Sequence, residues 1–222
     1  MYELLDLKRN KDRRRTSVAI IFATLSALTA LATKADDAVH ELVRAMHGAT
    51  HQLNYVGDFV YQRGVQLDSM RLVHEFDGQR ERERLVSLSG PAREVIRDGK
   101  TVTCYFADDK AVMVEQNPPR ETLGIGLSAP LEILQQSYQF KLLEHDRVAG
   151  RTALIVAVTP KSDDRYAYQL WIDEESKLLL KSVTMGGGRI LEQVQFTRVD
   201  VLDEIAPELL LPSIDGGGLT WQ

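Results

Sequence analysis

The stretch Asn54 to Leu88, NYVGDFVYQRGVQLDSMRLVHEFDGQRERERLVSL, decides the fold because it predicts three successive antiparallel strands. Side chains along it alternate between two faces, which is the two-residue period of a strand. Gly64 separates the first strand from the second, and Asp77-Gly78 is a strong hairpin signal before the third. A meander of half-buried strands therefore forms the predicted core.

Eight more strand segments follow along the chain, most of them joined by tight turns. They are Arg93 to Arg97, Thr101 to Phe106, Ala111 to Glu115, Phe140 to Val148, Ala153 to Thr159, Tyr166 to Asp173, Leu178 to Met185 and Ile190 to Val199. Twist accumulates in so broad a sheet, so the sheet must curl. We predict a mainly β (α+β) domain, built as a strongly curved antiparallel half-barrel of about eleven strands.

Two helices are expected to cover this sheet. A long N-terminal helix is capped by Asp36 or Asp37, and its apolar positions recur at three- and four-residue spacing. These positions are Val39, Leu42, Val43, Met46 and Leu53. A short helix starts at Pro130, after a loop from Arg120 to Ala129 that we expect to act as a mobile lid.

Because two helices cannot cover the whole sheet, its concave side is the predicted place of an apolar cavity that takes acyl chains. The candidate lining residues alternate along predicted strands. They are Tyr55, Phe59, Tyr61, Leu72, Phe76, Leu170 and Ile172.

Three arginines, Arg80, Arg82 and Arg84, point the same way from the third strand. Their guanidinium groups could hold a phosphate or a carboxylate with two parallel hydrogen bonds. The alternative is pairing with acidic residues on the neighbouring strands, which is common at sheet surfaces.

No catalytic constellation stands out in the sequence. A G-x-S-x-G motif is absent, and Cys104, the only cysteine, lies in an apolar strand where a buried core position is expected. His47 and His51 are four residues apart, as metal ligands on a helix can be, but no carboxylate lies between them as in zinc proteases. We therefore expect no enzymatic activity, no cofactor and no metal.

Charge and the N-terminus indicate an exported protein. The chain carries 27 Lys and Arg against 32 Asp and Glu, a balance that argues against nucleic-acid binding. Arg13 to Arg15, the apolar run Ser17 to Leu31 and Ala30-Leu31-Ala32 match the three regions of a secretory signal. We predict a signal peptide over residues 1–32 and a mature protein in the periplasm, with a membrane anchor as the alternative.

Several segments together resemble the RseB/MucB family of periplasmic sigma-E regulators. They are NYVGDFVYQRG at 54–64, Glu83-Arg84-Leu85, GPAREVIRDGK at 90–100, and Cys104-Tyr105-Phe106 followed by Ala107-Asp108. The resemblance runs in one order from about Val39 to Ile214.

This resemblance implies a LolA/LolB-like half-barrel and a regulatory role. Such a protein would bind the periplasmic part of a membrane-spanning anti-sigma factor of the RseA/MucA type and shield it from proteolysis. It would release this partner when lipid or lipopolysaccharide enters the cavity. The alternative functions are a periplasmic lipoprotein carrier of the LolA type and an outer-membrane lipid-modifying enzyme, for which we find no nucleophile.

The domain organisation follows from these assignments. Residues 36–212 form the lipid-binding half-barrel domain, and Pro207 to Pro212 leaves its last strand. Asp215 to Gly218 has the composition of a flexible linker. Residues 213–222 are therefore predicted to be a linker and the truncated start of a C-terminal domain.

Overall fold

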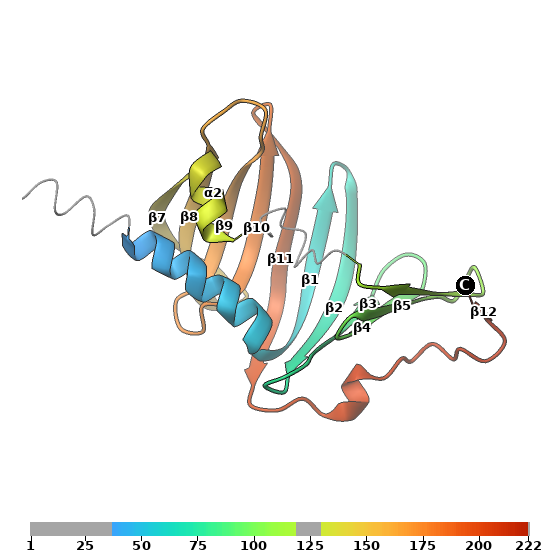
Figure 1. Cartoon of the computed structure of the whole chain (residues 1–222). Helices are drawn as coiled ribbons and strands as arrows, with labels where there is room; N and C mark the ends of the chain where they lie inside the picture. Colours follow the sequence, from blue (N-terminus) through green and yellow to red (C-terminus); the bar gives the residue numbers. More distant parts are fainter. Residues whose placement is uncertain (1–36, 119–129, 222) are drawn as a thin grey trace, which may run out of the picture. The chain divides into compact units, whose positions relative to one another are not determined.

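The computed structural model describes residues 37–118 and 130–221, within which twelve strands form one sheet (Figure 1). The strand order is β12-β6-β5-β4-β3-β2-β1-β11-β10-β9-β8-β7. Neighbouring strands are antiparallel, except that β12 runs parallel to β6. The predicted fold class, a mainly β domain with a curved antiparallel sheet and two helices, is confirmed. The predicted signal peptide and the predicted lid from Arg120 to Ala129 lie outside the described residues.

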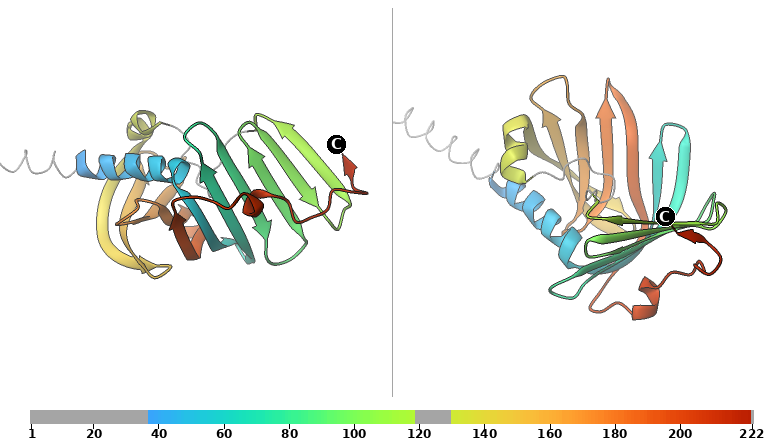
Figure 2. Two further views of the ribbon diagram at one scale, coloured as in Figure 1. Left: turned by 90° about the horizontal axis from the view of Figure 1, so that it is seen from below. Right: turned by 45° about the vertical axis from the view of Figure 1, so that its right-hand side comes forward.

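The sheet has two parts that differ in strand length. The broad wing consists of β1 (Asn54–Arg63), β2 (Gln66–Phe76), β7 (Tyr138–Val148), β8 (Arg151–Pro160), β9 (Ala167–Asp173), β10 (Leu179–Gly186) and β11 (Arg189–Leu202). The narrow wing consists of β3 (Glu81–Ser87), β4 (Arg93–Asp98), β5 (Thr101–Phe106), β6 (Ala111–Gln116) and β12 (Thr220–Trp221). Figure 2 shows the narrow wing turning away from the plane of the broad wing.

The chain divides into two compact units, residues 1–41 and 42–222, and the whole sheet belongs to the second. An N-terminal helix covers residues 37–52, as the sequence predicts. Within the second unit, its buried positions Val43, Met46 and Ala49 recur every three residues. A short helix, α2 (Leu131–Ser137), begins directly after Pro130, also as predicted. No helix among the described residues is long and apolar enough to span a bilayer.

Aromatic packing fills the centre of the broad wing. The Phe196 ring is fully buried and meets the rings of Tyr55 and Phe59 edge-on, with centroids 6.4 and 5.7 Å away. A Cβ atom added to Gly57 would lie 2.5 Å from this ring, so only glycine fits beneath it. Strand β1 therefore supplies two large core residues, Tyr55 and Phe59, and between them a glycine that leaves room for the Phe196 ring of β11.

The C-terminal segment covers the opposite face of the sheet. A 3-10 helix, η1 (Pro207–Leu210), places Leu210 with Ile205 against Val73. Further on, Thr220 N–H donates to the Lys110 carbonyl at 2.8 Å as β12 joins the sheet. The segment predicted as a linker is thus held to the narrow wing through residue 221, and a further domain beyond it stays a prediction.

Candidate ligand-binding site

All seven residues predicted to line the cavity lie on one face of the sheet. Directly opposed residues of antiparallel strands point to the same side. The register links Tyr61 to Val194, Val194 to Ser182, and Ser182 to Leu170, so β1 and β9 present these side chains on a common face. The other five follow from the same register and from alternation along each strand.

The end of the N-terminal helix, within residues 42–52, lies on this face as well. The Tyr55 hydroxyl donates to the carbonyl of Thr50, near the end of the helix, at 3.4 Å. Burial of Tyr55, followed by the charges of Glu83 and Glu81, raises the pKa of its hydroxyl well above 10.0. The hydroxyl therefore remains neutral.

Most of the seven residues are packed into the core. Tyr55, Leu170 and Ile172 are fully buried, Phe59 and Leu72 nearly so, and Tyr61 and Phe76 are partly exposed. A role for them in lining a lipid cavity stays a prediction.

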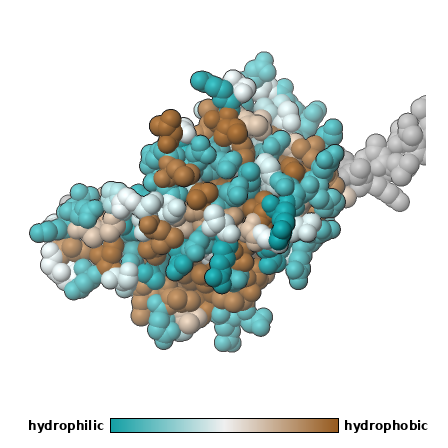
Figure 3. Space-filling view, turned by 180° about the vertical axis from the view of Figure 1, so that it is seen from behind, coloured by the Kyte–Doolittle hydropathy of each residue, from teal (hydrophilic) through white to brown (hydrophobic). Residues whose placement is uncertain are grey.

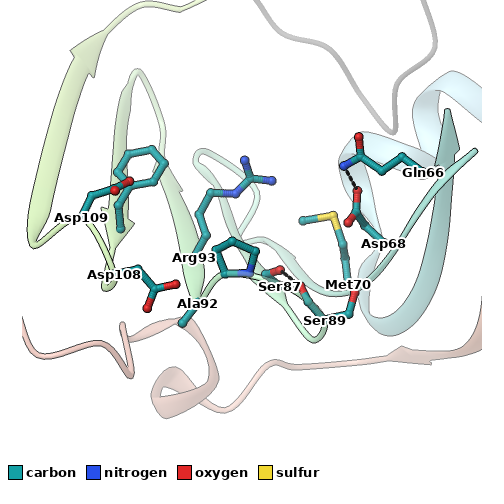
Figure 4. Close-up of a pocket in the computed structure, with 11 residues that line it drawn as sticks. Gln66, Asp68, Met70, Ser87, Ser89, Ala92, Arg93, Asp108 and Asp109 are labelled. Carbon is teal, nitrogen blue, oxygen red and sulfur yellow. Dashed lines mark hydrogen bonds between the residues drawn. The ribbon is translucent and has the colours of Figure 1, made fainter.

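A pocket of about 270 Å³ opens at one end of the same face (Figure 4). Met70 connects it to the core, because Met70 pairs with Phe59 across the strands and also lines the pocket. The lining consists of Gln66, Asp68, Met70, Ser87, Ser89, Pro91, Ala92, Arg93, Phe106, Asp108 and Asp109.

The pocket combines an apolar floor with a charged rim. Met70 and Phe106 supply apolar surface, and the Arg93 side chain extends toward the same open space (Figure 4). Asp108 and Asp109 add carboxylates at the rim. Pockets for whole small molecules usually measure roughly 300–1,000 Å³, so this one is slightly smaller than a typical small-molecule site.

From the core, a row of apolar side chains runs across the narrow wing on the same face. Each member pairs with the next on the adjacent strand. We call this the apolar row: Leu72, Leu85, Val95, Cys104 and Met113. Exposure rises along it, from 6% at Leu72 to 48% at Met113. Only Leu72 was predicted from the sequence to line the cavity, because finding the other members requires the strand register as well as the alternation within each strand.

Cys104 is only half-buried, although the sequence analysis expected a core position. Its strand lies in the narrow wing, where this face is not covered as fully as in the broad wing. Burial raises the pKa of the thiol above 9.0, with opposing charges of Arg93 and Glu115 contributing less.

The three predicted anion-binding arginines form ion pairs with neighbouring strands. Arg80 pairs with Asp98, Arg82 with Glu75, and Arg84 with Glu94. The alternative of cross-strand pairing therefore describes their environment, and contact with an external anionic group stays a prediction.

The pair of Arg84 and Glu94 is buried and tied to the C-terminal segment. Glu94 is 2% exposed and accepts hydrogen bonds from Arg84 Nε at 3.2 Å and from the backbone N–H of Ser213 at 2.9 Å. Burial alone would raise the pKa of Glu94, but these bonds and a further one from the Ser213 hydroxyl lower it below 4.5. No sequence motif indicates Ser213 as a partner of Glu94, because the two residues are 119 positions apart.

Seen from behind, the molecule shows hydrophilic side chains interspersed with apolar ones (Figure 3). Val114 lies next to Met113 on β6 but points to the other face, and it is 39% exposed. Substitutions of Met113 and Val114 can therefore test the two faces of the narrow wing separately.

Comparison with known proteins gives consistent matches. The family model described as the MucB/RseB N-terminal domain matches residues 38–214. The sigma factor AlgU regulatory protein MucB of Pseudomonas aeruginosa is 34% identical, over 84% of this chain and 57% of that protein. The sigma-E factor regulatory protein RseB of Haemophilus influenzae is 28% identical, over 80% of this chain and 57% of that protein.

Solved structures of MucB are also similar. The crystal structure of MucB superimposes with a TM-score of 0.68 at 26% identity, covering 83% of this chain and 65% of that one. The crystal structure of MucB in complex with MucA(peri) superimposes with a TM-score of 0.64 at 27% identity. The match covers 79% of this chain and 60% of that one. The chain spans just under three fifths of the length of the two curated relatives.

Proposed function

Because the chain belongs to the MucB/RseB N-terminal domain family, we propose that it is part of a periplasmic negative regulator of the sigma-E envelope stress response. It binds the periplasmic part of an anti-sigma factor of the RseA/MucA type, shields that segment from proteolysis, and responds to lipid or lipopolysaccharide. The family match over residues 38–214 carries this proposal, since it spans every strand from β1 to β11.

The apolar row is the surface best suited to such binding. Its five members sit on five successive strands, and neighbouring strands lie about 4.8 Å apart, so the row is about 19 Å long. An extended peptide of about six residues has the same length. An acyl chain of similar length fits the same chemistry, with its end reaching toward the pocket at Met70.

Peptide and lipid would therefore compete for one face of the narrow wing. A ligand can displace a partner only through a difference in affinity between the free and the partner-bound protein. When both ligands use the same apolar surface, lipid binds the free protein but not the partner-bound protein, because one ligand excludes the other. Regulation then rests on occupancy, without any catalytic step.

Substitution at the exposed end of the row tests this proposal. The chain is titrated with a purified periplasmic domain of an anti-sigma factor of this type, using wild type, Met113→Glu and Val114→Glu. Met113→Glu should weaken binding at least about tenfold, because a charge has to be desolvated against an apolar ligand. Val114→Glu is the matched control, since it adds the same charge to the same strand on the other face.

Equal affinity of all three proteins, each shown to be folded by circular dichroism, would contradict a binding surface on the apolar row. Absence of any binding by the wild type would count against the regulatory function of this chain. It would then favour the carrier function, which needs lipid binding but no anti-sigma partner.

A further inference from the structure

Two histidines and two glutamates meet where the N-terminal helix reaches the sheet. His51 comes from the helix, His74 from β2, and Glu81 and Glu83 from β3. His74 is fully buried and Glu81 is 7% exposed, whereas the side chains of His51 and Glu83 are about one quarter exposed. The cluster therefore has a buried base and a side that opens to solvent.

Hydrogen bonding decides which ring nitrogen of His74 carries a hydrogen. Its Nδ1 lies 2.7 Å from the Leu53 carbonyl oxygen, which only accepts, so Nδ1 carries the hydrogen. In a neutral imidazole the Nε2 atom is then an acceptor, yet it lies 3.0 Å from Oε1 of Glu81. Two acceptors at this distance require a proton or a metal cation between them.

The same carboxylate oxygen has a second histidine beside it. Oε1 of Glu81 lies 3.0 Å from Nδ1 of His51. The Tyr55 ring stacks on His74, with centroids 4.8 Å apart and an interplanar angle of 12°, and so holds the imidazole plane in place. Side chains from the helix and from two strands therefore converge on one oxygen.

This arrangement matches the way proteins hold metal ions. A metal-ligating histidine usually donates its other ring N–H to a backbone carbonyl or a carboxylate, which fixes the ring and its tautomer. His74 has this orientation toward Leu53. Donor atoms of His74, Glu81 and Glu83 lie within 4.8 Å of one another. Tetrahedral zinc with bonds near 2.0–2.2 Å places its ligand atoms about 3.3–3.6 Å apart, so shifts of about 1 Å would close the group around an ion.

One neighbouring cation has to be reconciled with such a site. Arg97 Nε lies 3.3 Å from Oε2 of Glu83. An ion at this site would share the Glu83 carboxylate with Arg97, and the contact with Arg97 would orient the carboxylate.

We propose that His51, His74, Glu81 and Glu83 bind one divalent transition-metal ion, for which zinc is the suitable probe. Imidazole and carboxylate donors suit zinc, and four protein ligands are typical of its structural sites. The ion would replace the proton between His74 and Glu81 and cross-link the N-terminal helix to β2 and β3. The sequence predicted no metal, because the candidate pair His47 and His51 has no carboxylate between its members. The other ligands come from the hairpin around Asp77-Gly78.

Zinc titration of the untagged chain, after removal of metal with EDTA and dialysis, tests this proposal. A chromophoric competitor chelator measures affinity, and cobalt substitution gives a visible spectrum that reports tetrahedral coordination. We expect one zinc ion per chain and a rise in thermal stability with zinc concentration, because an ion that binds only the folded state stabilises it.

Glu81→Gln and Glu83→Gln preserve shape and remove one charge each. Each should weaken zinc binding at least about tenfold and change the cobalt spectrum. The matched control is Glu174→Gln, because Glu174 faces His145 in an exposed pair at 3.9 Å. This control should bind zinc as the wild type does.

Wild-type protein that binds no stoichiometric zinc would overturn the proposal and leave a proton-bridged ion pair as the account of the cluster. Equal zinc affinity in the two ligand variants and the control would overturn it too. If Glu81→Gln fails to fold, the variant Glu83→Gln decides the question, because Glu83 is more exposed than Glu81.

Discussion

The broad and narrow wings of the sheet are held together by different interactions. In the broad wing, long strands bury aromatic and aliphatic side chains against one another, with Phe196 and Leu170 fully inaccessible to solvent. In the narrow wing, β3 and β4, of seven and six residues, are linked by ion pairs such as Arg84–Glu94 and Arg97–Glu83. Stability should therefore reside mainly in the broad wing.

This difference suggests why a ligand would bind the narrow wing. A fully packed face has no room for a ligand, whereas the apolar row becomes progressively more exposed toward Met113. The Arg84–Glu94 pair lies on the other face, whereas the Arg97–Glu83 pair lies on the face of the row, beside Leu85 and Val95. Both pairs link β3 to β4. One wing thus serves as scaffold and the other offers an accessible surface, and the following experiments test this division.

The largest effect is expected from Phe196→Ala in the broad wing. Truncating a fully buried phenylalanine leaves a cavity, so the free energy of unfolding should fall by about 3–5 kcal/mol. Met113→Ala in the narrow wing should change it by less than about 0.5 kcal/mol. Urea denaturation followed by tryptophan fluorescence measures both. Similar losses from the two variants would show that the wings do not differ as described.

The next largest decrease in the free energy of unfolding is expected from Arg84→Ala, which leaves the buried Glu94 without its charged partner. We expect about 2–3 kcal/mol, because a buried carboxylate deprived of a hydrogen-bonded cation is costly. Arg71→Ala is the control, since Arg71 pairs with Asp58 at 2.7 Å but is half-exposed. An exposed pair should contribute less than about 1 kcal/mol. A larger loss from the Arg71 variant than from the Arg84 variant would show that charge pairing matters more in the broad wing.

A smaller and gradual effect is expected from acid. Despite burial, hydrogen bonds from arginine and serine neighbours lower the pKa of Glu94 below 4.5 and that of Asp173 below 3.8. A carboxyl group with a depressed pKa stabilises the fold fully above its unfolded-state value and loses this contribution as pH falls through the folded value. The thermal midpoint should therefore decline below about pH 4.5.

Glu94→Gln separates the contributions of the two wings to this pH dependence. The variant should be less stable at neutral pH and decline less steeply in acid, with the remaining slope due to Asp173 and other carboxylates. An acid profile parallel to that of the wild type would show that Glu94 does not contribute.

The smallest change should follow Trp221→Ala in β12. Its ring is 57% exposed and meets Tyr105 edge-on with centroids 6.3 Å apart. We expect a loss of about 0.5–1 kcal/mol and faster hydrogen exchange at the Thr220 amide, which bonds to Lys110. A loss comparable to that of Phe196→Ala would mean that the C-terminal segment, and not the broad wing, holds the sheet together.

Sequence periodicity predicted the eleven longer strands because alternation and turn signals are local. It missed β12, whose two residues are too few to show a period, and it placed Arg80 in a strand that begins at Glu81. The pairing between strands depends on residues far apart in the sequence. The apolar row and the hydrogen bond from Ser213 to Glu94 therefore could not be predicted from residue spacing. A two-residue turn at Asp77-Gly78 would place His74 opposite Glu81, whereas the turn in the structure spans residues 77–80 and pairs His74 with Glu83.

The most direct test of a regulator that works by occupancy is a lipid titration with and without its partner. Lipid A binding to this chain is measured with a fluorescent probe, alone and with a saturating periplasmic domain of an anti-sigma factor. Because occupancy of the apolar row by one ligand excludes the other, we predict that the apparent lipid affinity falls in proportion to the partner concentration once it exceeds the partner's Kd. Lipid should weaken partner binding in the same way. Equal lipid affinity in both titrations would contradict the account.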